Sequence, residues 1–424
     1  MAKGCFSVSK FLIEGRKKLS GEVSVQGSKN STLPILASTL LCRDECVLHN
    51  CPNLSDVDSS MKMLRYLGCK ASRHQHTLLV DSSDMNCCDI PHSLMREMRS
   101  SIVFLGVIVA RMGRARLSFP GGCELGPRPI DLHLKALRQM GVTIKENHGE
   151  LDCVAEKGLV GAKIALSFPS VGATENIMIA AVLAKGTTVI TNCAREPEIC
   201  DLADFLNKCG AKIYGAGEGT IVIDGVERLK GVQHTIIPDR IVAATLMSAA
   251  AVTNSKIVLR DIIQSHLGSV IPVFEEAGCR IHCKDGVMKF QAPQRLSAIK
   301  QIRTMPYPGF PTDAQAPLMS VTTVANGISV FVENIFESRY KHVGELLRLG
   351  ANIKVEGKVA VVEGVEELSS TTVEAQDLRG AGALVVAGLA ADGVTEVNGI
   401  RHLERGYEDF EVVLSSLGAS VKKF

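Results

Sequence analysis

A lysine lies where a helix is expected to begin, close to the N-terminus. The segment Gly27-Ser-Lys-Asn30 directly precedes the apolar run Leu33-Pro-Ile-Leu36, and a serine in front of such a run is a typical helix cap. Backbone N–H groups at a helix N-terminus favour an anion, and Lys29 adds a positive charge beside them. The pattern suits a phosphate or carboxylate ligand, although a solvent-exposed lysine beside an ordinary cap is the plainer interpretation.

A cysteine lies in a loop rich in glycine and proline, at Pro120-Gly-Gly-Cys123. The two glycines permit backbone conformations that few other residues adopt. Arg128 follows shortly after, and an arginine beside a cysteine favours the thiolate form. The loop is therefore a candidate for a reactive thiol, and an incidental cysteine in a plain loop is the alternative.

An aspartate follows a stiff segment in the second half of the chain. Asp313 comes after Pro308 and Pro311, and proline restricts the backbone in a way that suits a positioned base. A helix-capping or solvent-exposed aspartate would give the same pattern. The segment thus supplies a candidate proton acceptor with an ordinary structural alternative.

Three arginines recur in the last third of the chain, at Arg339, in Asp377-Leu-Arg379 and in Arg405-Gly-Tyr407. They occupy equivalent sides of successive sequence repeats. The planar guanidinium group matches a carboxylate or phosphate with two parallel hydrogen bonds. The three side chains are therefore candidates to converge on one anion, whereas each taken alone also fits a surface ion pair.

The usual cofactor and metal motifs are absent from the sequence. It has no G-x-x-x-x-G-K-[ST] phosphate loop, no H-E-x-x-H zinc helix and no G-x-S-x-G elbow. Gly215-Ala-Gly-Glu-Gly219 is not a dinucleotide fingerprint, because its third glycine is misplaced and no helix is expected after it. Cys42 and Cys46, and Cys279 and Cys283, lack a matching pair at finger spacing and fit small buried hydrophobes better. We therefore expect neither a metal ion nor a nucleotide cofactor.

The composition disfavours several classes of partner. A net charge of +2 gives no general attraction to nucleic acid or to an acidic membrane surface. An anionic ligand must then be held by a local cluster of basic residues. Trp is absent and aromatic residues make up 4%, which disfavours recognition of sugars or bases mainly by aromatic stacking.

The N-terminal segment and the cysteine content predict the compartment. The first 18 residues alternate polar and apolar side chains and do not resemble a signal peptide. The apolar run from Ile102 to Ala110 is far shorter than a membrane span. In a long chain without such a signal, 14 cysteines are expected to be reduced thiols. We predict a cytoplasmic protein with no membrane partner.

A helix end followed by glycine and then a strand occurs six times. The repeats lie 68 to 73 residues apart. Glycine after the last helical turn can adopt the left-handed conformation that caps a helix, and the residues after it alternate as in a strand. The six glycines are Gly68, Gly141, Gly210, Gly278, Gly350 and Gly418.

The repeat predicts the domain organisation. An Ala/Leu-rich helix, a short turn and a β-branched strand recur upstream of each glycine, for example from Ile179 to Ile190. Each unit is thus expected to be α/β, and 424 residues exceed one ordinary core. Six units divide into two domains of three, with the start of the chain completing one of them. We expect one domain to span residues 28–237 and the other to combine residues 1–27 and 238–424.

Ten segments in order carry a resemblance to a known family. They are Gly27-Ser-Lys-Asn30, Met98-Arg-Ser-Ser-Ile102, Pro120-Gly-Gly-Cys123, Arg128-Pro-Ile-Asp-Leu132, Ser170-Val-Gly-Ala-Thr174, Arg195-Glu-Pro-Glu198, Pro238-Asp-Arg-Ile241, Phe310-Pro-Thr-Asp313, Asp377-Leu-Arg379 and Arg405-Gly-Tyr-Glu408. Through nearly its whole length the sequence resembles the UDP-N-acetylglucosamine 1-carboxyvinyltransferases. These enolpyruvyl transferases begin the synthesis of peptidoglycan precursors. Their fold consists of two inside-out α/β domains, each built from three repeats.

The resemblance implies roles in the transfer of an enolpyruvyl group from phosphoenolpyruvate to a sugar hydroxyl. Asp313 would be the base toward the 3-hydroxyl of UDP-N-acetylglucosamine. Cys123 would be the general acid at the methylene carbon and could form a covalent adduct with the enolpyruvyl group. Lys29, Arg128 and Arg405 would hold phosphoenolpyruvate. The implied catalytic residues are therefore Cys123, Asp313, Lys29 and Arg405.

The resemblance also implies the substrate-binding residues. Asn30 and Arg99 would contact the nucleotide sugar, residues 128–132 and 168–171 would line the uridine site, and Ile335 would touch the ligand. The full set is Lys29, Asn30, Arg99, Arg128, Pro129, Ile130, Asp131, Leu132, Phe168, Ser170, Val171, Gly172, Asp313, Ile335, Arg339, Asp377, Arg379 and Arg405. A monomer that needs no cofactor is expected.

The sequence departs from the family pattern at two positions, and two rival functions remain. Val242 stands where the family usually has Glu, and Phe168 stands where some relatives have Lys. One rival is the sister enzyme that uses shikimate 3-phosphate, which lacks the Pro-Gly-Gly-Cys loop. The other is a non-catalytic paralogue that binds a nucleotide sugar. The presence of Lys29, Cys123 and Asp313 disfavours that paralogue.

Overall fold

The computed structural model describes residues 9–119 and 130–424. The chain folds as two compact units, and it passes from one unit to the other near residues 26 and 237. Residues 27–119 and 130–237 belong to one unit, here called the insert unit. Residues 9–26 and 238–424 belong to the other, called the terminal unit. Each unit has a hydrophobic core of its own.

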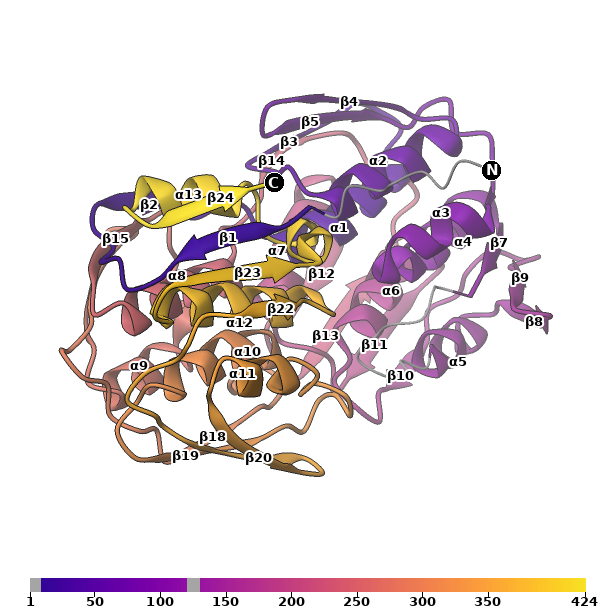
Figure 1. The fold of residues 1–424 in the computed structure, drawn as a ribbon. Helices are drawn as coiled ribbons and strands as arrows, with labels where there is room; N and C mark the ends of the chain where they lie inside the picture. The colour runs from indigo at the N-terminus through magenta and orange to yellow at the C-terminus, as the bar shows by residue number, and fades with distance from the viewer. Residues whose placement is uncertain (1–8, 120–129) are drawn as a thin grey trace, which may run out of the picture. The chain divides into compact units, whose positions relative to one another are not determined.

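The described residues of the insert unit form three four-stranded sheets, and Figure 1 shows their strands. The strand orders are β14-β3-β5-β4, β6-β7-β9-β8 and β10-β11-β13-β12. The strands are β3 (Cys46–His49), β4 (Lys70–His74), β5 (Thr77–Asp81), β6 (Asp89–Ile90), β7 (Arg114–Ser118), β8 (Thr143–Asn147), β9 (Glu150–Val154), β10 (Lys163–Ala165), β11 (Thr187–Thr191), β12 (Lys212–Tyr214), β13 (Thr220–Asp224) and β14 (Gln233–Thr235).

The described residues of the terminal unit also form three four-stranded sheets. Their orders are β16-β17-β15-β2, β18-β19-β21-β20 and β22-β23-β1-β24. The strands are β1 (Phe11–Glu14), β2 (Glu22–Ser24), β15 (Lys256–Arg260), β16 (Arg280–Lys284), β17 (Val287–Gln291), β18 (Gln301–Arg303), β19 (Ile328–Val332), β20 (Asn352–Glu356), β21 (Val359–Glu363), β22 (Thr372–Glu374), β23 (Val394–Asn398) and β24 (Ser420–Lys423). The first two strands of the chain thus complete sheets formed by its last third.

All six sheets of the described residues share one topology. Each has one parallel pair, and the other two pairings are antiparallel; the parallel pairs are β14 with β3, β6 with β7, β10 with β11, β2 with β15, β18 with β19 and β22 with β23. In the insert unit, β14 from the end of the unit pairs with β3 from its start. The repeat found in the sequence is therefore a repeat of structure.

The six repeat glycines cap helices as predicted. All have positive φ, from +92° at Gly141 and Gly350 to +108° at Gly210. After each glycine, the next backbone N–H donates to a carbonyl five residues earlier, as in Cys69 to Leu64 and Ala419 to Leu414. This is the Schellman arrangement, in which glycine avoids the steric cost of the left-handed conformation.

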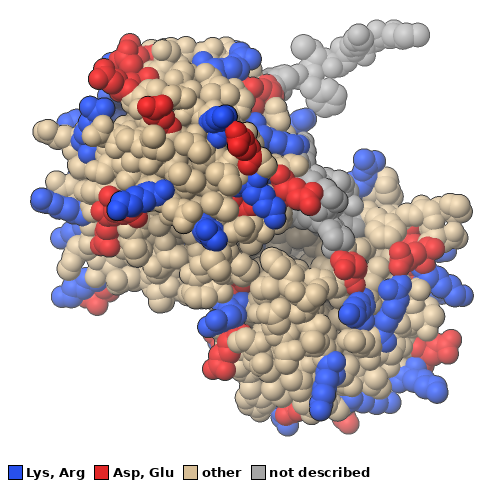
Figure 2. All heavy atoms as spheres, turned by 90° about the horizontal axis from the view of Figure 1, so that it is seen from below, with Lys and Arg blue, Asp and Glu red and all other residues tan. Residues whose placement is uncertain are grey.

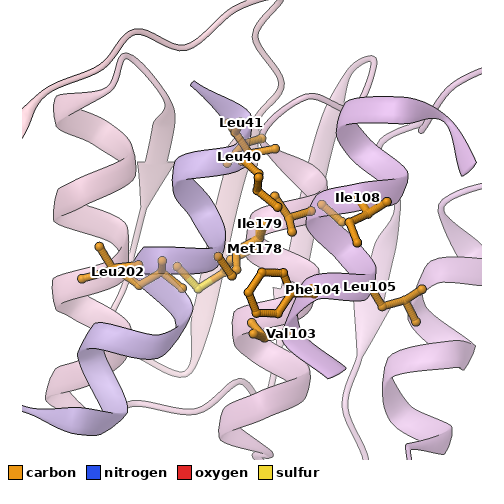
Figure 3. Packing of buried hydrophobic residues seen from close by; sticks show 14 of the residues in the cluster. Leu40, Leu41, Val103, Phe104, Leu105, Ile108, Met178, Ile179 and Leu202 are labelled. Carbon is orange, nitrogen blue, oxygen red and sulfur yellow. The ribbon is translucent and has the colours of Figure 1, made fainter. Parts of the chain in front are cut away.

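One helix of each repeat is buried on almost every side. These central helices are α1 (Lys29–Ser38), α4 (Val103–Met112), α6 (Val171–Ala181), α8 (Arg240–Val252), α10 (Thr312–Thr322) and α12 (Leu378–Ala390). After their first turns, α8 and α12 are apolar or small all round, as expected for helices that have no solvent-facing side. Within the terminal unit α8, α10 and α12 pack on one another. In the insert unit, Phe104 of α4 lies beside Ile179 and Met178 of α6 (Figure 3).

The helices of a second set each have one exposed side. These are α2 (Ser55–Tyr66), α5 (Asp131–Gln139), α7 (Pro197–Lys208), α9 (Ile271–Glu276), α11 (Val343–Arg348) and α13 (Phe410–Ser416), with α3 (His92–Glu97) as an additional helix. Short 3-10 helices are η1 (Thr39–Leu41), η2 (Arg99–Ile102), η3 (Gln264–Leu267) and η4 (Ile400–Arg405). Within the described ranges, no helix has both the length and the apolar character that crossing a membrane requires.

The cysteine pairs noted in the sequence are mainly core residues. Cys42, Cys46 and Cys279 are buried and Cys283 is half-buried. Cys42 lies 3.7 Å from Cys209, sulfur to sulfur. No cluster of His, Cys, Asp or Glu among residues 9–119 and 130–424 has the arrangement of a metal site.

Candidate active site

The N-termini of the central helices carry most of the residues that the sequence singled out. The first backbone N–H groups of a helix have no partner within the helix and carry a partial positive charge, which suits an anion or a capping side chain. The residues at or next to these N-termini are Lys29 and Asn30 at α1, Arg99 in η2 before α4, Ser170, Val171 and Gly172 at α6, Asp313 at α10, and Asp377 and Arg379 at α12.

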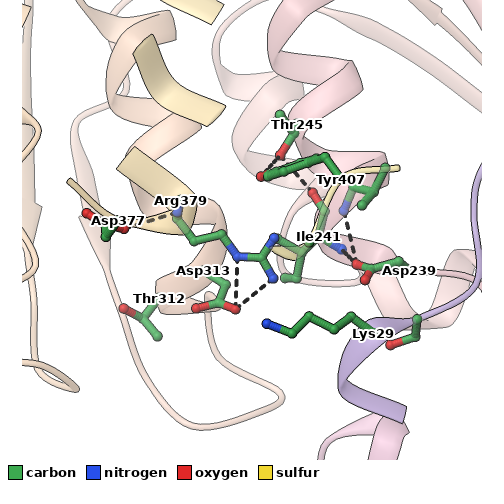
Figure 4. Close-up of polar contacts among 12 residues, drawn as sticks. Lys29, Asp239, Ile241, Thr245, Thr312, Asp313, Asp377, Arg379 and Tyr407 are labelled. Atoms are coloured by element: carbon green, nitrogen blue, oxygen red, sulfur yellow. Dashed lines mark hydrogen bonds and ion pairs between the residues drawn. The ribbon is translucent and has the colours of Figure 1, made fainter. Parts of the chain in front are cut away.

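In the terminal unit, Asp313 accepts hydrogen bonds from two arginines (Figure 4). Nε and Nη2 of Arg379 donate to Oδ2 at 3.1 and 3.0 Å. Nη2 of Arg339 donates to Oδ1 at 2.9 Å, and the same guanidinium donates to the carbonyl of Thr312. The two arginine side chains are 2–3% exposed, whereas that of Asp313 is 27% exposed. Two buried cations therefore hold the ionised carboxylate, and its accessible part faces solvent.

Arg379 retains an unused donor. Its Nη1 is buried and has no hydrogen-bond partner within the part of the chain that the structure describes. The guanidinium lies over the ring of Tyr407, 5.5 Å from the centroid. Burial lowers the pKa of Arg379, but Asp313, Tyr407 and Asp239 raise it by more, so the group stays charged. A buried charged donor without a partner is costly, and it fits the place of an anionic ligand.

Capping and hydroxyl contacts fix the backbone around this arginine. Asp377 caps α12 by accepting from the backbone N–H groups of Arg379 and Gly380, each at 3.0 Å. Asp239 caps α8 in the same way. The hydroxyl groups of Tyr407 and Thr245 lie 3.0 Å apart. Contacts among α8, α10, α12 and the loop at Tyr407 therefore bring three helix N-termini of this unit together.

The remaining predicted residues of the terminal unit lie at the ends of elements. Arg405 is the last residue of η4 and is half-buried. Ile335 is half-buried, and its backbone N–H donates to Oε1 of Glu333 at 2.8 Å. Oε2 of the same buried glutamate accepts from the hydroxyl of Thr312 at 3.0 Å. Glu333 thus ties the loop of Ile335 to the start of the helix that carries Asp313.

In the insert unit, Lys29 forms a buried ion pair. Its Nζ lies 2.6 Å from Oδ2 of Asp56, and the two side chains are 9% and 3% exposed. Lys29 is the first residue of α1 and Asp56 lies in the first turn of α2. Ser28 caps α1 through a hydrogen bond from the N–H of Ser31. The sequence pointed to a lysine at a helix cap, but the lysine is paired and buried, which excludes the solvent-exposed alternative.

A buried polar network anchors the start of α1. The hydroxyl of Ser31 donates to Oδ2 of Asp201, which also accepts from the backbone N–H of Ile237. The ring of His234 contacts Oδ1 of Asp201 at 2.9 Å through Nε2. These three side chains are at most 4% exposed. The network connects α1 with α7 and β14, so it restrains the backbone that presents Lys29.

The two segments that the resemblance assigned to uridine lie close together in the insert unit. Ile130 precedes α5 and Asp131 is its exposed first residue, with Leu132 half-buried. A Cβ added at Gly172 would lie 3.4 Å from the His133 ring, which joins the start of α6 to α5. His133 in turn contacts the Asn176 amide at 3.0 Å. Phe168 is 43% exposed, just before this helix start.

Three predicted residues, Cys123, Arg128 and Pro129, lie outside the described residues. Arg99 begins η2, but its side chain is likewise outside the described part of the structure. Their roles remain those that the resemblance implies.

Several residues near the candidate site were missed from the sequence. Asp56 is distant from Lys29 along the chain, and nothing in its surroundings distinguishes it from other acidic residues. Glu175 is buried, and burial together with Glu198 and Glu196 raises its pKa well above the ordinary value. His342 is buried with no hydrogen bond to either ring nitrogen from the described residues, and burial lowers its pKa to about 4. Of these three residues, only Glu175 carried a signal in the sequence, because it is a charged residue within an otherwise apolar helix.

The arrangement in the terminal unit supports proton transfer next to an anion. Asp313 is a partly exposed carboxylate that can accept a proton, and Arg379 offers a buried donor beside it. Such preorganised charges stabilise charge that develops during a reaction. Lys29 supplies a buried cation in the insert unit. The set in the terminal unit fits chemistry on a phosphorylated or carboxylated substrate.

Comparison with known proteins identifies the family. The family model of EPSP synthase (3-phosphoshikimate 1-carboxyvinyltransferase) matches residues 13–414. The chain is 50% identical over 414 residues to UDP-N-acetylglucosamine 1-carboxyvinyltransferase 2 of Caldanaerobacter subterraneus subsp. tengcongensis, covering 98% of this chain and 99% of the relative. It is 46% identical over 416 residues to UDP-N-acetylglucosamine 1-carboxyvinyltransferase of Trichlorobacter lovleyi, covering 98% and 99%.

Solved structures agree on the fold. The enolpyruvyl transferase NikO from Streptomyces tendae matches with a TM-score of 0.89 at 25% identity, covering 98% of each chain. EPSP synthase from Acinetobacter baumannii matches with a TM-score of 0.75 at 18% identity, covering 98% of this chain and 100% of that chain. The predicted architecture of two α/β domains with three repeats each is confirmed as this fold.

Proposed function

The chain belongs to the UDP-N-acetylglucosamine 1-carboxyvinyltransferases of the EPSP synthase family, and from this we propose that it transfers enolpyruvyl from phosphoenolpyruvate to the 3-hydroxyl of UDP-N-acetylglucosamine. Inorganic phosphate is released, and the reaction is the first committed step of peptidoglycan synthesis. The observation that carries the proposal is Asp313 held by Arg339 and Arg379. This set provides a base and a cation at one place.

Asp313 is proposed to accept the proton of the sugar hydroxyl. As the hydroxyl oxygen attacks the central carbon of phosphoenolpyruvate, a proton is added to the methylene carbon, giving a tetrahedral intermediate. Loss of phosphate and of a methyl proton then restores the double bond. The two guanidinium groups keep Asp313 ionised and oriented before it takes the proton.

The anion-binding role falls to basic residues of both units. Arg379 has the buried unused Nη1, and Lys29 is a buried cation at a helix start. Arg405 and Arg128 are added on the strength of the family resemblance. Each of these residues is proposed to bind the carboxylate or the phosphate of phosphoenolpyruvate, because guanidinium and ammonium groups both donate strongly to such oxygens.

The nucleotide end of the acceptor is assigned to the insert unit. Residues 130–132 and 168–172 come together at the starts of α5 and α6. Asn30, Arg99 and Pro129 join this assignment by resemblance, as do Ile335 and Asp377 from the terminal unit. The chain is proposed to act in the cytoplasm without a cofactor, and each chain carries its own complete set of these residues.

The acceptor decides between this function and its nearest rival. Purified full-length protein is incubated with phosphoenolpyruvate and either UDP-N-acetylglucosamine or shikimate 3-phosphate, and phosphate release is measured. We expect release only with the nucleotide sugar. Release with shikimate 3-phosphate would identify the sister activity, and binding of the nucleotide sugar without release under any condition would support a non-catalytic paralogue.

Cys123 is proposed as the acid at the methylene carbon. A thiol has an ordinary pKa of about 8.5, so it holds a proton near neutral pH and still gives it up readily. Cys123→Asp should therefore retain activity with a more acidic pH optimum, and Cys123→Ser should lose far more. Fosfomycin, an epoxide that mimics phosphoenolpyruvate, should alkylate this thiol, faster with the nucleotide sugar present. Mass spectrometry that finds another cysteine modified and Cys123 intact would refute the assignment.

A further inference from the structure

The six sheets of the described residues allow their outer faces to be compared position by position. In each sheet one face packs on a helix and alternate residues of the two middle strands point outward. On five of the sheets these outward positions carry at most two aliphatic side chains. They also carry charged residues, such as Arg114 and Arg116 in β7 or Lys289 in β17.

The sheet β18-β19-β21-β20 differs from the other five. Five of its six outward positions are aliphatic, namely Ile328, Val330 and Val332 from β19 and Val359 and Val361 from β21, and the sixth is Glu363, which pairs with Ile328. Ile328 is 55% exposed, Val361 37% and Val359 36%. We call these five residues the aliphatic face. None of them is a residue of the candidate active site, so catalysis does not explain them.

Strand register places the aliphatic face in the centre of the sheet. Val330 pairs with Val361, and Val332 pairs with Val359. The four valines thus form one contiguous block across the two middle strands. Figure 2 is seen from the side on which β18, β19 and β20 lie in Figure 1, and it shows uncharged areas between groups of charged side chains.

The edge strands add charges of opposite sign. Arg303 of β18 pairs with Val332, and Glu356 of β20 pairs with Val359. One row across the sheet therefore reads Arg303, Val332, Val359 and Glu356, with the cation at one edge and the anion at the other. Arg303 is exposed and forms no ion pair with any residue in the described ranges. Glu356 forms an ion pair with Lys354 of its own strand, at 3.0 Å.

This row is complementary to a copy of itself. Consider a two-fold axis that runs parallel to the strands, above the outer face and midway between β19 and β21. Rotation about it places the sheet of a second copy face to face with the first, with the two edges of the sheet exchanged. Arg303 of one chain then lies over the partner's Glu356, and Val332 lies over the partner's Val359. The next row places Val330 over the partner's Val361, and the row at the end of the face places Ile328 over the partner's Glu363. Isologous pairing of this kind is the usual way in which identical subunits associate.

We propose that the aliphatic face is the contact surface of a reversible homodimer, formed by packing this sheet on the same sheet of a second copy of the chain. The block of valines supplies apolar contact, and the two symmetric Arg303–Glu356 contacts supply orientation. An interface formed by one short sheet from each chain buries a small area, below about 1,200 Å² in total. Because interfaces of this size are weak, the dimer dissociates on dilution. Each chain retains its own catalytic residues.

Sedimentation velocity on the full-length protein tests the dimer. From low micromolar to near-millimolar concentration, the weight-average mass should rise from 45.4 kDa toward twice that value. Val361→Lys puts a charge into the centre of the face beside Lys354 and should keep the protein monomeric at all concentrations. A wild-type protein that stays at 45.4 kDa throughout overturns the proposal.

A matched control distinguishes this face from exposed aliphatic residues in general. Val394 is 56% exposed at the outward first position of β23, in another sheet of the same topology. Val394→Lys should dimerise like the wild type. If Val394→Lys disrupts the dimer as much as Val361→Lys does, or if Val361→Lys leaves the dimer intact, the aliphatic face is not the contact surface.

Charge reversal tests the symmetry independently of the valines. Arg303→Glu and Glu356→Arg should each weaken association several-fold, because each places like charges opposite one another twice in the dimer. The double reversal restores opposite charges and should recover the wild-type constant. Both residues are exposed, so folding should be unaffected, and unchanged thermal unfolding confirms this. Failure of the double variant to recover rules out the two-fold arrangement.

Discussion

The two units share one fold, but they carry different charged residues at the starts of their central helices. In the insert unit, the charged residue at the start of a central helix is Lys29, joined to Asp56 in a pair that is buried on both sides. In the terminal unit, the corresponding residue is Asp313, joined to two arginines and partly exposed. The first arrangement places a cation firmly, and the second keeps a carboxylate accessible beside surplus donors.

The difference shows how a repeat acquires function. The helix starts are equivalent in fold, and their backbone N–H groups give each the same electrostatic character. What distinguishes them is one or two side chains and the residues that these contact. The scaffold therefore sets where chemistry can occur, and individual side chains give each helix start its own charge.

The strongest test of the contrast removes the carboxylate of the terminal unit. Asp313→Asn eliminates the proposed base and should lower kcat by about a hundred-fold to ten-thousand-fold. It also leaves two buried guanidinium groups without their anion, which should destabilise the protein by roughly 3 kcal/mol. Steady-state phosphate release and urea unfolding measure the two effects. The exposed Asp58, which pairs with Arg73, serves as control, and Asp58→Asn should change neither. Near-normal kcat in Asp313→Asn would remove this residue from the chemistry.

The next test asks whether the pair in the insert unit is structural, catalytic or both. Lys29→Met removes the buried cation that pairs with Asp56 and should cost about 3 kcal/mol in the free energy of unfolding. Replacing both partners, as Lys29→Met with Asp56→Leu, should recover most of that stability because no buried charge remains unpaired. Activity should not recover, since the cation is still missing. An active double variant would assign Lys29 a structural role alone.

The fold was predictable because its signals are local. A glycine after a helix end is recognised from neighbouring residues, and all six repeat glycines have the positive φ that this signal implies. The buried helices could be found because Ala, Leu and Val recur without a polar stripe in segments such as α12. Sheet order was harder, because β1 and β2 pair with strands more than 200 residues away.

The candidate site was predictable only in part, because its residues come together through tertiary structure. Asp313 and Arg379 lie 66 residues apart in sequence, and their contact depends on the packing of α10 on α12. The resemblance pointed to both residues, but it did not indicate that Arg379 donates hydrogen bonds directly to Asp313. Asp56 carried no signal, since an aspartate in the first turn of a helix is ordinary. Burial of the partners became visible only in the structure.

A finer test compares the two arginines within the terminal unit. Arg379 has the unused Nη1, whereas Arg339 also bonds to the carbonyl of Thr312. Lysine keeps the charge and loses the planar fork. We expect Arg379→Lys to raise KM for phosphoenolpyruvate about tenfold, since one charged hydrogen bond is worth ~1.5–3 kcal/mol. Arg339→Lys should mainly lower kcat, because it loosens Asp313. Equal effects on KM would show that the unused donor does not meet the substrate.

The smallest expected effect concerns Glu175, a buried carboxyl at the start of α6 in the insert unit. In contrast to Asp313, it has acidic neighbours, and burial with Glu198 and Glu196 raises its pKa in the folded protein. A carboxyl whose folded pKa is raised stabilises the fold fully below its unfolded pKa of about 4.3. That stability is lost as the pH rises toward the folded pKa, because the unfolded chain then ionises and the folded one does not.

Glu175→Gln removes this titration while keeping the shape of the side chain. Between pH 5 and the folded pKa, the wild type should lose up to ~1.4 kcal/mol of unfolding free energy per pH unit from this group, and the variant should not. Urea unfolding at several pH values measures both slopes. Glu156→Gln, at an exposed position of the same unit, is the control and should keep the wild-type slope. If the slope of Glu175→Gln equals that of the wild type, Glu175 is ionised in the folded protein, and the insert unit must then provide it with a cation as the terminal unit does for Asp313.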